Sequence, residues 1–455
     1  MNSLLEYAID FPELILPFIH YNFISAILAG IALLCLLHRR KVGIYLLDFA
    51  CYQPPDAHRL PMATFLEHVS LDDQFDPDSV AFQIKILEKS GFSAETSVPP
   101  SLLRLPIKKT LPLTLEEAKT VMFAVVSDLL KKKNINPKSI DILICNGSMF
   151  SPTPSMSSMI INKFKMRSNI MSFNLSGMGC SAGIAAVSLA KDLLTVHRNS
   201  LALIVSTEML TPNWYTGKNR SMLLTNCLFR VGGAAILMSS RDQDKKLAKY
   251  TLHHIVRTNN ARDDESYFSV FQDADTEGEI GVSISKNIIV AAGNALKANM
   301  ASLGPMVLPF SELLRYMMSL IGLKLQLIRS KNIYRPDFKR AFDHLCIHAG
   351  GKAVIQAIEK SLGLSKEDVE ASNMTLYRFG NTSSSSIWYE LSYLQGKGRI
   401  KQDDRVCQIA FGSGFKCASA VWKCINNVKD NNIGNAWSDR IHLYPINVPH
   451  LIRID

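Results

Sequence analysis

The two halves of this chain carry similar strand-and-turn segments at one constant spacing. Residues 140–147 have a strand pattern that ends in Asn-Gly, and residues 342–350 have a matching pattern that ends in His-Ala-Gly. The matched polar positions are Asp141 with Asp343 and Asn146 with His348. Repeated patterns indicate repeated structural units, so the spacing predicts a fold with two equivalent halves. The alternative is chance similarity between two strand-rich segments.

Cys180 lies in a glycine-rich turn between two predicted elements. Residues 170–175 have the pattern of a strand, and residues 182–194 have the small-residue pattern of a helix. Amide groups and the dipole at a helix N-terminus stabilise a thiolate, and neighbouring glycines let a substrate approach closely. Cys180 is therefore a candidate nucleophile, although most free cysteines are buried packing residues.

Two polar residues in the second half follow strand-like runs. His348 ends the strand pattern of residues 342–347. Asn381 follows residues 376–380, which we interpret as a strand and turn ahead of a helix over residues 387–394. Sites are commonly built where buried strands end. Taken singly, however, such a histidine is often a core residue and such an asparagine is often a turn or helix cap.

The duplication is the reason to consider these three residues together. Segments 231–237 and 411–417 close the two halves in the same style. Equivalent elements of a duplicated fold meet around a pseudo-twofold axis, so Cys180, His348 and Asn381 are predicted to form one site. The fold class predicted is α/β, with two duplicated halves over residues 42–245 and 246–455.

Several long motifs occur in a family-specific order along the chain. They are Pro152-Thr153-Pro154-Ser155, Phe173-Asn174-Leu175, Gly177-Met178-Gly179-Cys180-Ser181-Ala182-Gly183, Asn213-Trp214-Tyr215, Cys346-Ile347-His348-Ala349-Gly350-Gly351 and Gly380-Asn381-Thr382-Ser383-Ser384-Ser385-Ser386. In these motifs the chain resembles the plant 3-ketoacyl-CoA synthases, the condensing enzymes of very-long-chain fatty acid elongation. The resemblance runs from about Leu46 to the region of Ser419.

The resemblance implies a thiolase-like fold with a Cys-His-Asn triad at Cys180, His348 and Asn381. It implies condensation of a long-chain acyl-CoA with malonyl-CoA through an acyl-cysteine intermediate, with release of CO2 and CoA. It also implies a homodimer, other fatty acid elongase subunits as partners, and the endoplasmic reticulum membrane as the location. Decarboxylation itself generates the carbanion, so no metal and no cofactor are expected.

The chain departs from the family pattern near the predicted site. Asn259 and Tyr377 stand where the family commonly has histidine, and Ala418 replaces a usual asparagine. Neither Asn259 nor Tyr377 exchanges a proton near neutral pH as histidine does, so a proton-handling or phosphate-pairing role there is lost. His344 lies four residues before His348, on the same face of a strand. We predict His344, Asn259 and Tyr377 as candidate lining residues of the substrate cavity.

Composition excludes several other classes of protein. The chain has 455 residues, 47% of them hydrophobic, so it can bury two joined cores. Its nine cysteines lack the spacing of a disulfide framework or a zinc site. The formal charge of +10 suits the phosphates of CoA or an anionic membrane. Basic residues are scattered and form no nucleic-acid motif, so we predict no nucleic-acid partner.

The N-terminal region contains an apolar run long enough for a membrane helix. Residues 14–37 contain no Asp, Glu, Lys or Arg, and about 20 apolar residues cross a bilayer. Glu6, Asp10 and Glu13 precede the run where a signal peptide has basic residues, which predicts a retained anchor. The basic cluster at 39–41 predicts that the rest of the chain faces the cytosol. Residues 1–41 are assigned to this anchor and its basic flank.

Two further segments have helical patterns. Thr114 and Glu117 form a capping-box pattern, which predicts a helix from Thr114 to Lys132. Residues 307–328 are rich in Leu, Met and Ile, and we predict a buried helix there. The alternative is a helix that dips into the headgroup region of a membrane and lets a long acyl chain pass to the site.

Three functions are compatible with the sequence. The first is an active 3-ketoacyl-CoA synthase. The second is a weakly active or inactive homologue that regulates active elongase subunits, which the changes at Asn259 and Tyr377 leave open. The third is a thiolase with Cys407 or Cys417 as its base, which ranks last because thiolases do not pair cysteine with this Asn-Thr-Ser motif. Dependence on malonyl-CoA separates the first from the third.

Overall fold

The computed structural model describes residues 42–325, 333–426 and 434–449. The described residues from Gly43 onward form one compact unit, whose strands make a nine-stranded sheet and a separate hairpin. The strands are β1 (Tyr45–Cys51), β2 (Ile142–Asn146), β3 (Met171–Leu175), β4 (Leu201–Thr207), β5 (Gly233–Ser239), β6 (Tyr250–Asn259), β7 (Val270–Ala274), β8 (Ile280–Ile284), β9 (His344–Ile347), β10 (Arg405–Gly412) and β11 (Lys416–Cys424).

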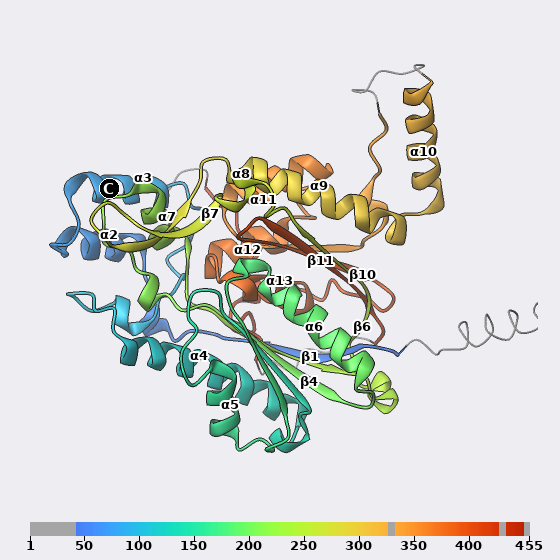
Figure 1. The fold of residues 1–455 in the computed structure, drawn as a ribbon, viewed down its shortest axis with the longest axis horizontal. Helices are drawn as coiled ribbons and strands as arrows, with labels where there is room; N and C mark the ends of the chain where they lie inside the picture. Colours follow the sequence, from blue (N-terminus) through green and yellow to red (C-terminus); the bar gives the residue numbers. More distant parts are fainter. Residues whose placement is uncertain (1–41, 326–332, 427–433, 450–455) are drawn as a thin grey trace, which may run out of the picture. The chain divides into compact units, whose positions relative to one another are not determined.

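The large sheet is assembled from two consecutive parts of the chain (Figure 1). Its order is β3-β2-β4-β5-β1-β6-β11-β10-β9, so residues 45–239 supply five neighbouring strands and residues 250–424 supply the other four. The parts meet where the start of β1 pairs with the start of β6. In each part the strand formed by the repeated segment of the sequence is parallel to its neighbours in that part, β2 to β3 and β4, and β9 to β10.

Burial on both faces explains the apolar sequences of the central strands. Every residue of β4 and of β5 is buried. A strand covered on both faces needs apolar side chains at successive positions, rather than the alternation of a half-exposed strand. β3, at the edge of the sheet, keeps partly exposed residues along its length.

Helices cover the sheet, and two of them pack between its two parts. They are α2 (Met62–Leu71), α3 (Pro77–Leu87), α4 (Leu111–Lys133), α5 (Met156–Phe164), α6 (Ala182–Val196), α7 (Arg220–Leu228), α8 (Asp264–Tyr267), α9 (Ile288–Val307), α10 (Phe310–Lys324), α11 (Lys352–Leu362), α12 (Glu370–Phe379) and α13 (Ser386–Gly396). α6 packs on β2, β4 and β11, and α13 packs on β1, β9 and β10. These two helices therefore form a central layer in contact with both parts (Figure 1).

Asp141 and Asp343 make the same backbone contacts in the two parts. Asp141 Oδ2 accepts from the N–H of Leu201 at 2.7 Å, and the N–H of Asp141 donates to the Leu201 carbonyl at 2.9 Å. Asp343 repeats both contacts with Arg405, at 2.7 and 2.9 Å. Leu201 and Arg405 each begin the neighbouring parallel strand. The matched aspartates of the sequence therefore have the same structural role.

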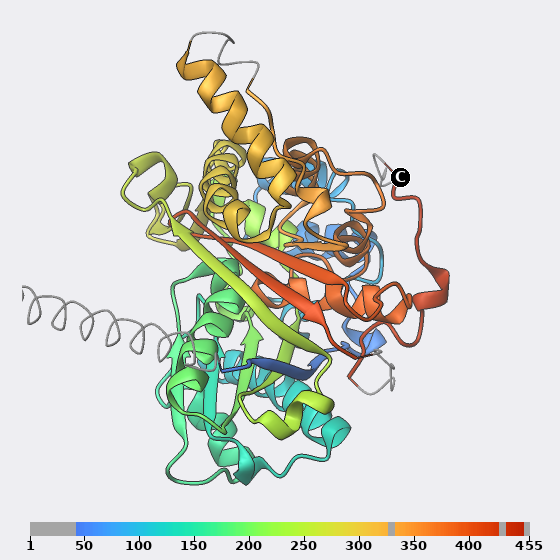
Figure 2. The same ribbon diagram turned by 90° about the vertical axis from the view of Figure 1, so that its right-hand side faces the viewer.

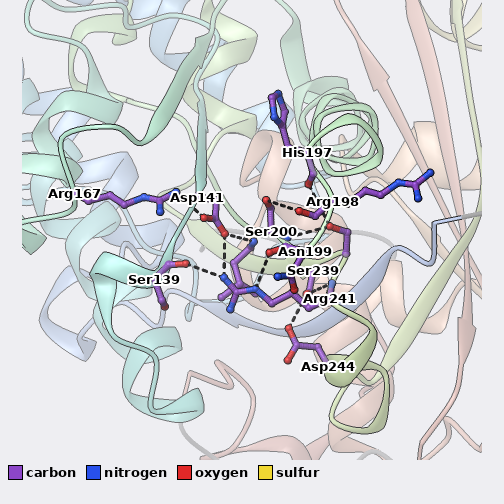
Figure 3. Close-up of polar contacts among 12 residues, drawn as sticks. Ser139, Asp141, Arg167, His197, Arg198, Asn199, Ser200, Ser239, Arg241 and Asp244 are labelled. Atoms are coloured by element: carbon purple, nitrogen blue, oxygen red, sulfur yellow. Dashed lines mark hydrogen bonds and ion pairs between the residues drawn. The ribbon is translucent and has the colours of Figure 1, made fainter.

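The Asp141 carboxylate also belongs to a cluster of ion pairs (Figure 3). Arg167 Nη2 lies 2.6 Å from Asp141 Oδ1, and Arg241 Nη2 lies 3.1 Å from Asp141 Oδ2. Arg241 also donates to the backbone carbonyls of Ser139 and Asn199. The cluster joins the segments that lie next to β2, β4 and β5. Within the described residues, Asp343 forms no ion pair of this kind.

Residues 376–379 are helical, whereas the sequence pattern predicted a strand. They are the last residues of α12, which ends at Gly380 with a φ of 68°. Leu376 and Phe379 are buried on this helix, and a short apolar run has the same appearance in a buried helix and a buried strand. The turn before Asn381 is therefore entered from a helix, while the turn before Cys180 is entered from β3.

The helix predicted from Thr114 to Lys132 is confirmed as part of α4, but the capping box predicted at its start is wrong. α4 begins at Leu111, because Pro112 fits the first turn of a helix, where its missing N–H costs no hydrogen bond. The Glu117 carboxylate is buried and accepts from the N–H groups of Leu210 and Thr211 at 2.7 and 2.9 Å. It fastens the helix to the loop after β4 instead of capping the helix itself.

The predicted anchor over residues 14–37 lies outside the described residues. Within the described part of the chain, residues 179–196 are the one helical segment with the length and mean hydropathy of a membrane span. Half of that segment is buried inside the unit, where it is the central helix α6 with its leading turn. Its apolar character is therefore accounted for by packing between the two parts of the sheet.

The buried helix predicted over residues 307–328 is wrong for most of the segment. α9 ends at Val307, and α10 starts a new direction at Phe310. Glu312 is the one buried residue of α10, although most of the helix is apolar. Hydrophobic composition alone therefore predicted burial that the described fold does not provide.

Candidate active site

Cys180 lies where β3 leads into the central helix α6. Gly177 and Gly179 have φ values of 67° and 62°, a region that other residues rarely adopt. A Cβ on Gly179 would lie 2.4 Å from the backbone nitrogen of Ser413, so the turn requires glycine there. A 3-10 turn over Gly179–Ser181 continues directly into α6. The strand-to-helix position predicted for Cys180 is confirmed.

The half-buried thiol of Cys180 faces a hydroxyl from the second half of the chain. Ser383 Oγ lies 3.4 Å from Cys180 Sγ and 3.4 Å from Glu208 Oε2. Burial raises the pKa of the Cys180 thiol to about 12, opposed by the hydrogen bond from Ser383 and reinforced by the Glu208 carboxyl. The resting group is therefore a thiol, and not the thiolate that a helix N-terminus alone suggests. Its activation requires a base that accepts the proton.

Glu208 is a buried residue of this site that the sequence motifs missed. It follows β4 directly, and its carboxylate accepts from the N–H groups of Ser148 and Met149 at 2.9 and 3.0 Å. Burial raises the pKa of the Glu208 carboxyl, while these hydrogen bonds lower it. The signal that identifies Glu208 is the one used for His348, a polar residue at the end of a buried strand.

His348 follows β9 and is almost fully buried. Its Nδ1 lies 2.6 Å from Ser386 Oγ, and the Ser386 hydroxyl donates to the Ser383 carbonyl at 3.1 Å. In this arrangement Ser386 accepts from the ring, so Nδ1 carries the proton and Nε2 has a lone pair. If the hydroxyl turns to donate to Nδ1, Nε2 carries the proton instead. Burial lowers the pKa of His348 to about 4, so the ring is neutral near pH 7.

Asn381 lies in the turn between α12 and α13, and both ends of its side chain are held. Its amide nitrogen donates to the Gly350 carbonyl at 3.2 Å, and its amide oxygen accepts from the N–H of Ser383 at 2.8 Å. Its backbone bonds to Leu228 and Arg230 at 3.2 and 2.9 Å, which fastens the turn to the first half of the chain. The amide nitrogen has two N–H groups, so one remains for a ligand.

Cys180, His348 and Asn381 line one cavity of about 610 Å³. The structure therefore brings together the three residues that the duplicated pattern predicted. Glu208 and Ser383 line the same cavity, so the nucleophile, its hydroxyl neighbour and the buried carboxyl belong to one site. The two halves of the chain each contribute to it.

The rest of the cavity lining is mostly apolar and includes three lysines. The cationic residues are Lys89, Lys286 and Lys352, and the apolar set includes Trp214, Leu224, Phe229, Val282, Ile284 and Ile289. The apolar residues come largely from α7, the β7–β8 hairpin and the start of α9. Such a lining suits a ligand that combines an apolar chain with anionic groups.

His344 and Asn259 do not line this cavity, which corrects their prediction. His344 begins β9, at the other end of the strand from His348, and its Nε2 lies 3.0 Å from Asp404 Oδ2. Asn259 is the exposed last residue of β6, and its side-chain oxygen accepts from the backbone of the following turn at 3.0 Å. Both side chains are occupied by contacts near the surface.

Tyr377 also lies outside the cavity, as do the two cysteines of the thiolase hypothesis. Tyr377 is on α12, where its ring packs against Tyr444 with centroids 6.5 Å apart. Cys407 and Cys417 are buried in the hydrophobic core of the second half, and burial raises the pKa of both thiols. Neither thiol is placed to act as a base beside Cys180.

Sequence comparison first defines the class of this protein. Residues 35–325 match the family described as FAE1/type III polyketide synthase-like protein. Residues 339–424 match the C-terminal part of 3-oxoacyl-(acyl-carrier-protein) synthase III. Together the two matches cover both halves of the chain and identify it as a condensing enzyme of this class.

Individual relatives define the family. Probable 3-ketoacyl-CoA synthase 21 of Arabidopsis thaliana is 56% identical over 427 residues, which cover 93% of this chain and 92% of the relative. The 3-ketoacyl-CoA synthase 6 of the same plant is 56% identical over 411 residues, covering 90% and 82%. This chain belongs to the 3-ketoacyl-CoA synthase family, a family of condensing acyltransferases.

Solved structures confirm the thiolase-like α/β fold predicted from the sequence. A fungal type III polyketide synthase, ORAS, superposes with a TM-score of 0.66 at 18% identity, covering 84% of this chain and 100% of that one. The 1,3,6,8-tetrahydroxynaphthalene synthase of Streptomyces coelicolor A3(2) gives 0.64 at 19% identity, covering 84% and 99%. At these identities the likeness concerns the fold.

Proposed function

We propose that this chain condenses a long-chain acyl-CoA with malonyl-CoA to a 3-ketoacyl-CoA, CO2 and CoA, in very-long-chain fatty acid elongation. One observation carries the proposal: Cys180, His348 and Asn381 line one cavity in a chain of the 3-ketoacyl-CoA synthase family. The reaction needs a nucleophile, a proton carrier and hydrogen-bond donors for an enolate oxygen. The three side chains are of the types that supply these functions.

The first half-reaction transfers the acyl group to Cys180. The thiol proton passes to Nε2 of the neutral His348, which has a lone pair in the tautomer that Ser386 accepts from. The sulfur attacks the thioester carbonyl, a new bond forms between Sγ and the carbonyl carbon, and the bond to the CoA sulfur breaks. His348 returns the proton to the departing CoA sulfur. The acyl group remains as a thioester on Cys180.

The second half-reaction begins with malonyl-CoA. The bond to the carboxylate carbon breaks, CO2 leaves, and the electron pair forms an enolate whose oxygen carries negative charge. An N–H from His348 Nε2 and the remaining N–H of Asn381 stabilise that oxygen. This step uses the tautomer in which the Ser386 hydroxyl donates to Nδ1. The low pKa of His348 favours a neutral donor, which does not protonate the carbanion prematurely.

Condensation completes the cycle. The enolate carbon attacks the thioester carbonyl on Cys180, a carbon–carbon bond forms, and the carbon–sulfur bond breaks. The product is a 3-ketoacyl-CoA that is longer than the primer. The released thiolate takes one proton from solvent through His348, because burial makes the thiol the stable form. The overall reaction therefore consumes one proton for each CO2 that it releases.

The lining of the cavity supports the proposed substrates. Lys89, Lys286 and Lys352 are the cationic lining residues, and CoA carries phosphate groups that such cations attract. The apolar walls from α7, the β7–β8 hairpin and α9 suit a long hydrocarbon chain. Both parts of an acyl-CoA thus have complementary surface in the same cavity.

The proposal also includes the setting of the enzyme. We propose that residues 14–37 anchor it in the endoplasmic reticulum membrane with the catalytic unit in the cytosol, on the basis of the uncharged run and the basic cluster at 39–41. We further propose a homodimer that acts with other fatty acid elongase subunits, as the family resemblance implies. Co-purification of differently tagged copies from microsomes would test the dimer.

One assay tests the proposed reaction. The full chain, purified with its membranes, is given carbon-labelled malonyl-CoA and a series of acyl-CoA primers. We expect labelled 3-ketoacyl-CoA and CO2 in equal amounts, and no product when malonyl-CoA is omitted. Product made from acyl-CoA alone would indicate a thiolase. A folded, membrane-inserted chain that makes no product with any primer would overturn the proposal and favour the regulatory homologue.

A further inference from the structure

α10 is an apolar helix that stands away from the sheet and its covering helices. Figures 1 and 2 show it at the edge of the catalytic unit in two perpendicular views. Its large side chains are exposed, with fractions of 77% for Phe310, 56% for Met317, 59% for Met318 and 62% for Leu325 just beyond its end. Exposed apolar side chains this numerous on one helix mark a binding surface.

The base of α10 is fixed by a buried polar cluster. The Glu312 carboxylate accepts from the Tyr334 hydroxyl at 2.7 Å, from the N–H of Asp337 at 3.0 Å and from Arg340 at 2.7 Å. In the next turns, Ser319 Oγ accepts from the N–H of Tyr334 at 2.7 Å. These bonds hold the helix to the returning chain. The exposed apolar face is therefore presented in a defined position.

Cations accompany this apolar face. Arg315 and Lys324 are exposed on α10, and Arg335, Lys339 and Arg340 are exposed on the returning segment, together with one acid, Asp337. The acidic residue of α10, Glu312, is buried, so it contributes little exposed negative charge. An apolar face bordered by exposed cations matches the surface of an anionic bilayer, with headgroup phosphates outside and acyl chains inside.

A second exposed apolar cluster lies beside the substrate cavity. Tyr267 and Phe268 are 42% and 53% exposed, and their rings pack against each other with centroids 4.9 Å apart. They end α8, directly before β7, and Val270 of β7 lines the cavity. In both perpendicular views α9 and α10 lie on the upper side of the unit, and α8 contacts α9.

We propose that α10 inserts its apolar face into the surface of an anionic phospholipid bilayer, with Tyr267 and Phe268 as a second contact next to the cavity. This contact lets the hydrocarbon chain of an acyl-CoA move from the bilayer into the cavity without crossing water. The lipid contact is inferred from the exposed apolar face of α10 and does not depend on the proposed reaction. The passage of the acyl chain rests on the proposed condensation reaction.

Tryptophan fluorescence tests the lipid contact in the full chain. The four native tryptophans, at 214, 388, 422 and 437, are buried, so a tryptophan added at an exposed position is readily distinguished. Met317→Trp places the probe on α10. Leu111→Trp is the matched control, because Leu111 is 59% exposed at the start of α4, which lies in the lower part of Figure 1.

Both variants are reconstituted in vesicles of phosphatidylcholine and phosphatidylserine, with and without brominated acyl chains. We expect brominated lipid to remove about half or more of the added emission of Met317→Trp, because an interfacial helix buries its apolar face among acyl chains. The control should retain its emission. Equal quenching of the two, or none in either, would overturn the proposal. A blue-shifted Met317→Trp that bromine does not quench would show a protein occupant, such as a second copy.

A double variant, Met317→Asp with Ile321→Asp, separates the contact from the chemistry. With a long primer held in vesicles we expect about a tenfold loss of condensation, because the charges oppose insertion. With a short, soluble primer the rate should match that of the parent. Equal losses with both primers would contradict a role in delivery. A parent chain without any condensation would refute the proposed function, while the quenching result would still decide the lipid contact.

Discussion

Asn146 and His348 occupy equivalent positions at the ends of β2 and β9, yet only His348 lines the cavity. Asn146 donates to Ser206 Oγ at 2.7 Å and accepts from Ser384 Oγ at 2.8 Å, so both ends of its amide are used inside the protein. His348 is held through one ring nitrogen by Ser386. The same framework therefore supports a structural amide in one half and a reactive imidazole in the other.

Cys180 and Asn381 show the limits of the duplication. Each lies in the turn that precedes a central helix, α6 or α13, and each lines the cavity. The turn of Cys180 is entered from β3 at the sheet edge, whereas that of Asn381 is entered from α12. The two halves therefore have similar structures at the turns that carry the site residues, and they differ in the elements that lead into those turns. Swapping residues between equivalent positions tests whether this division of roles is real.

The largest effect is expected for the nucleophile, which the first half alone provides. Cys180→Ala should lower condensation by about 10⁴-fold or more, because the acyl-enzyme cannot form. Mass spectrometry after incubation with acyl-CoA should show an acylated peptide in the parent and none in the variant. Acylation of the variant at another residue would show that the nucleophile lies elsewhere. Unchanged thermal unfolding would show that the variant remains folded.

The next effect concerns the donors of the second half. Asn381→Ala should slow release of CO2 from malonyl-CoA by about 10²–10³-fold and spare acylation of Cys180, because its N–H acts on the enolate. His348→Asn, which installs the residue of the equivalent position, should slow both half-reactions. Labelled CO2 and the rate of acyl transfer separate the two steps.

Asn146→Ala is the matched control for these variants. It removes an amide at the equivalent position of the first half, so it should lower the free energy of unfolding by about 1–3 kcal/mol without changing either half-reaction in the folded enzyme. A loss of CO2 release as large as that of Asn381→Ala would break the distinction between a structural and a catalytic half. Parental rates for His348→Asn would have the same consequence.

Much of this division could be predicted from the sequence, since strand ends and glycine turns are local patterns. The position of His348 follows from an apolar run that ends in a polar residue, and that of Cys180 follows from a glycine-rich turn between a strand pattern and a helix pattern. Asn381 was selected from a run interpreted as a strand, which is the end of helix α12. Partners from distant segments could not be predicted. Whether residues 376–379 are a strand or a helix, and whether α10 is covered, depends on packing against elements far away in the chain.

The same reasoning explains why three candidate lining residues were misplaced. His344, Asn259 and Tyr377 were selected by family position and strand periodicity. These criteria indicate the face of a strand on which a residue lies, but not how far the residue is from the cavity. His344 is the first of the four residues of β9, whereas His348 follows the last, so the length of the strand separates His344 from the cavity. Glu208, by contrast, satisfies the strand-end rule and lines the cavity, but it belongs to none of the matched motifs.

The two aspartates that directly precede β2 and β9 test the framework rather than the chemistry. Asp141→Ala should lower the free energy of unfolding by about 2–3 kcal/mol, because it leaves Arg167, Arg241 and a backbone N–H without their partly buried acceptor. Asp343→Ala should cost about 1 kcal/mol, because this exposed carboxylate holds a backbone N–H alone. Urea unfolding of the two variants compares the halves directly. Equal losses would show that the ion-pair cluster adds no stability.

A smaller effect is expected in the pH dependence of stability. The pKa of His348 falls to about 4 in the folded protein from an ordinary value of 6.5. Below pH 6.5 the unfolded chain binds a proton that the folded chain does not, so stability falls as the pH decreases from 7 to 5. His348→Asn should reduce that fall by about 2 kcal/mol at pH 5. Asn146→Ala should leave it unchanged, since an amide does not titrate.

The smallest effect is expected for two of the three departures from the family pattern, Asn259 and Tyr377, which lie in the second half but outside the cavity. Asn259→His with Tyr377→His should change condensation by less than about threefold with every primer, because neither side chain reaches the lining. The measurement is the rate for parent and double variant, side by side, over a series of acyl-CoA primers. A gain of about tenfold or more would show that the departures remove a needed contact and that the parent is a weakened enzyme. A change of primer preference at constant rate would instead indicate that surface positions of the second half reshape the acyl path through the packing of β6 and α12.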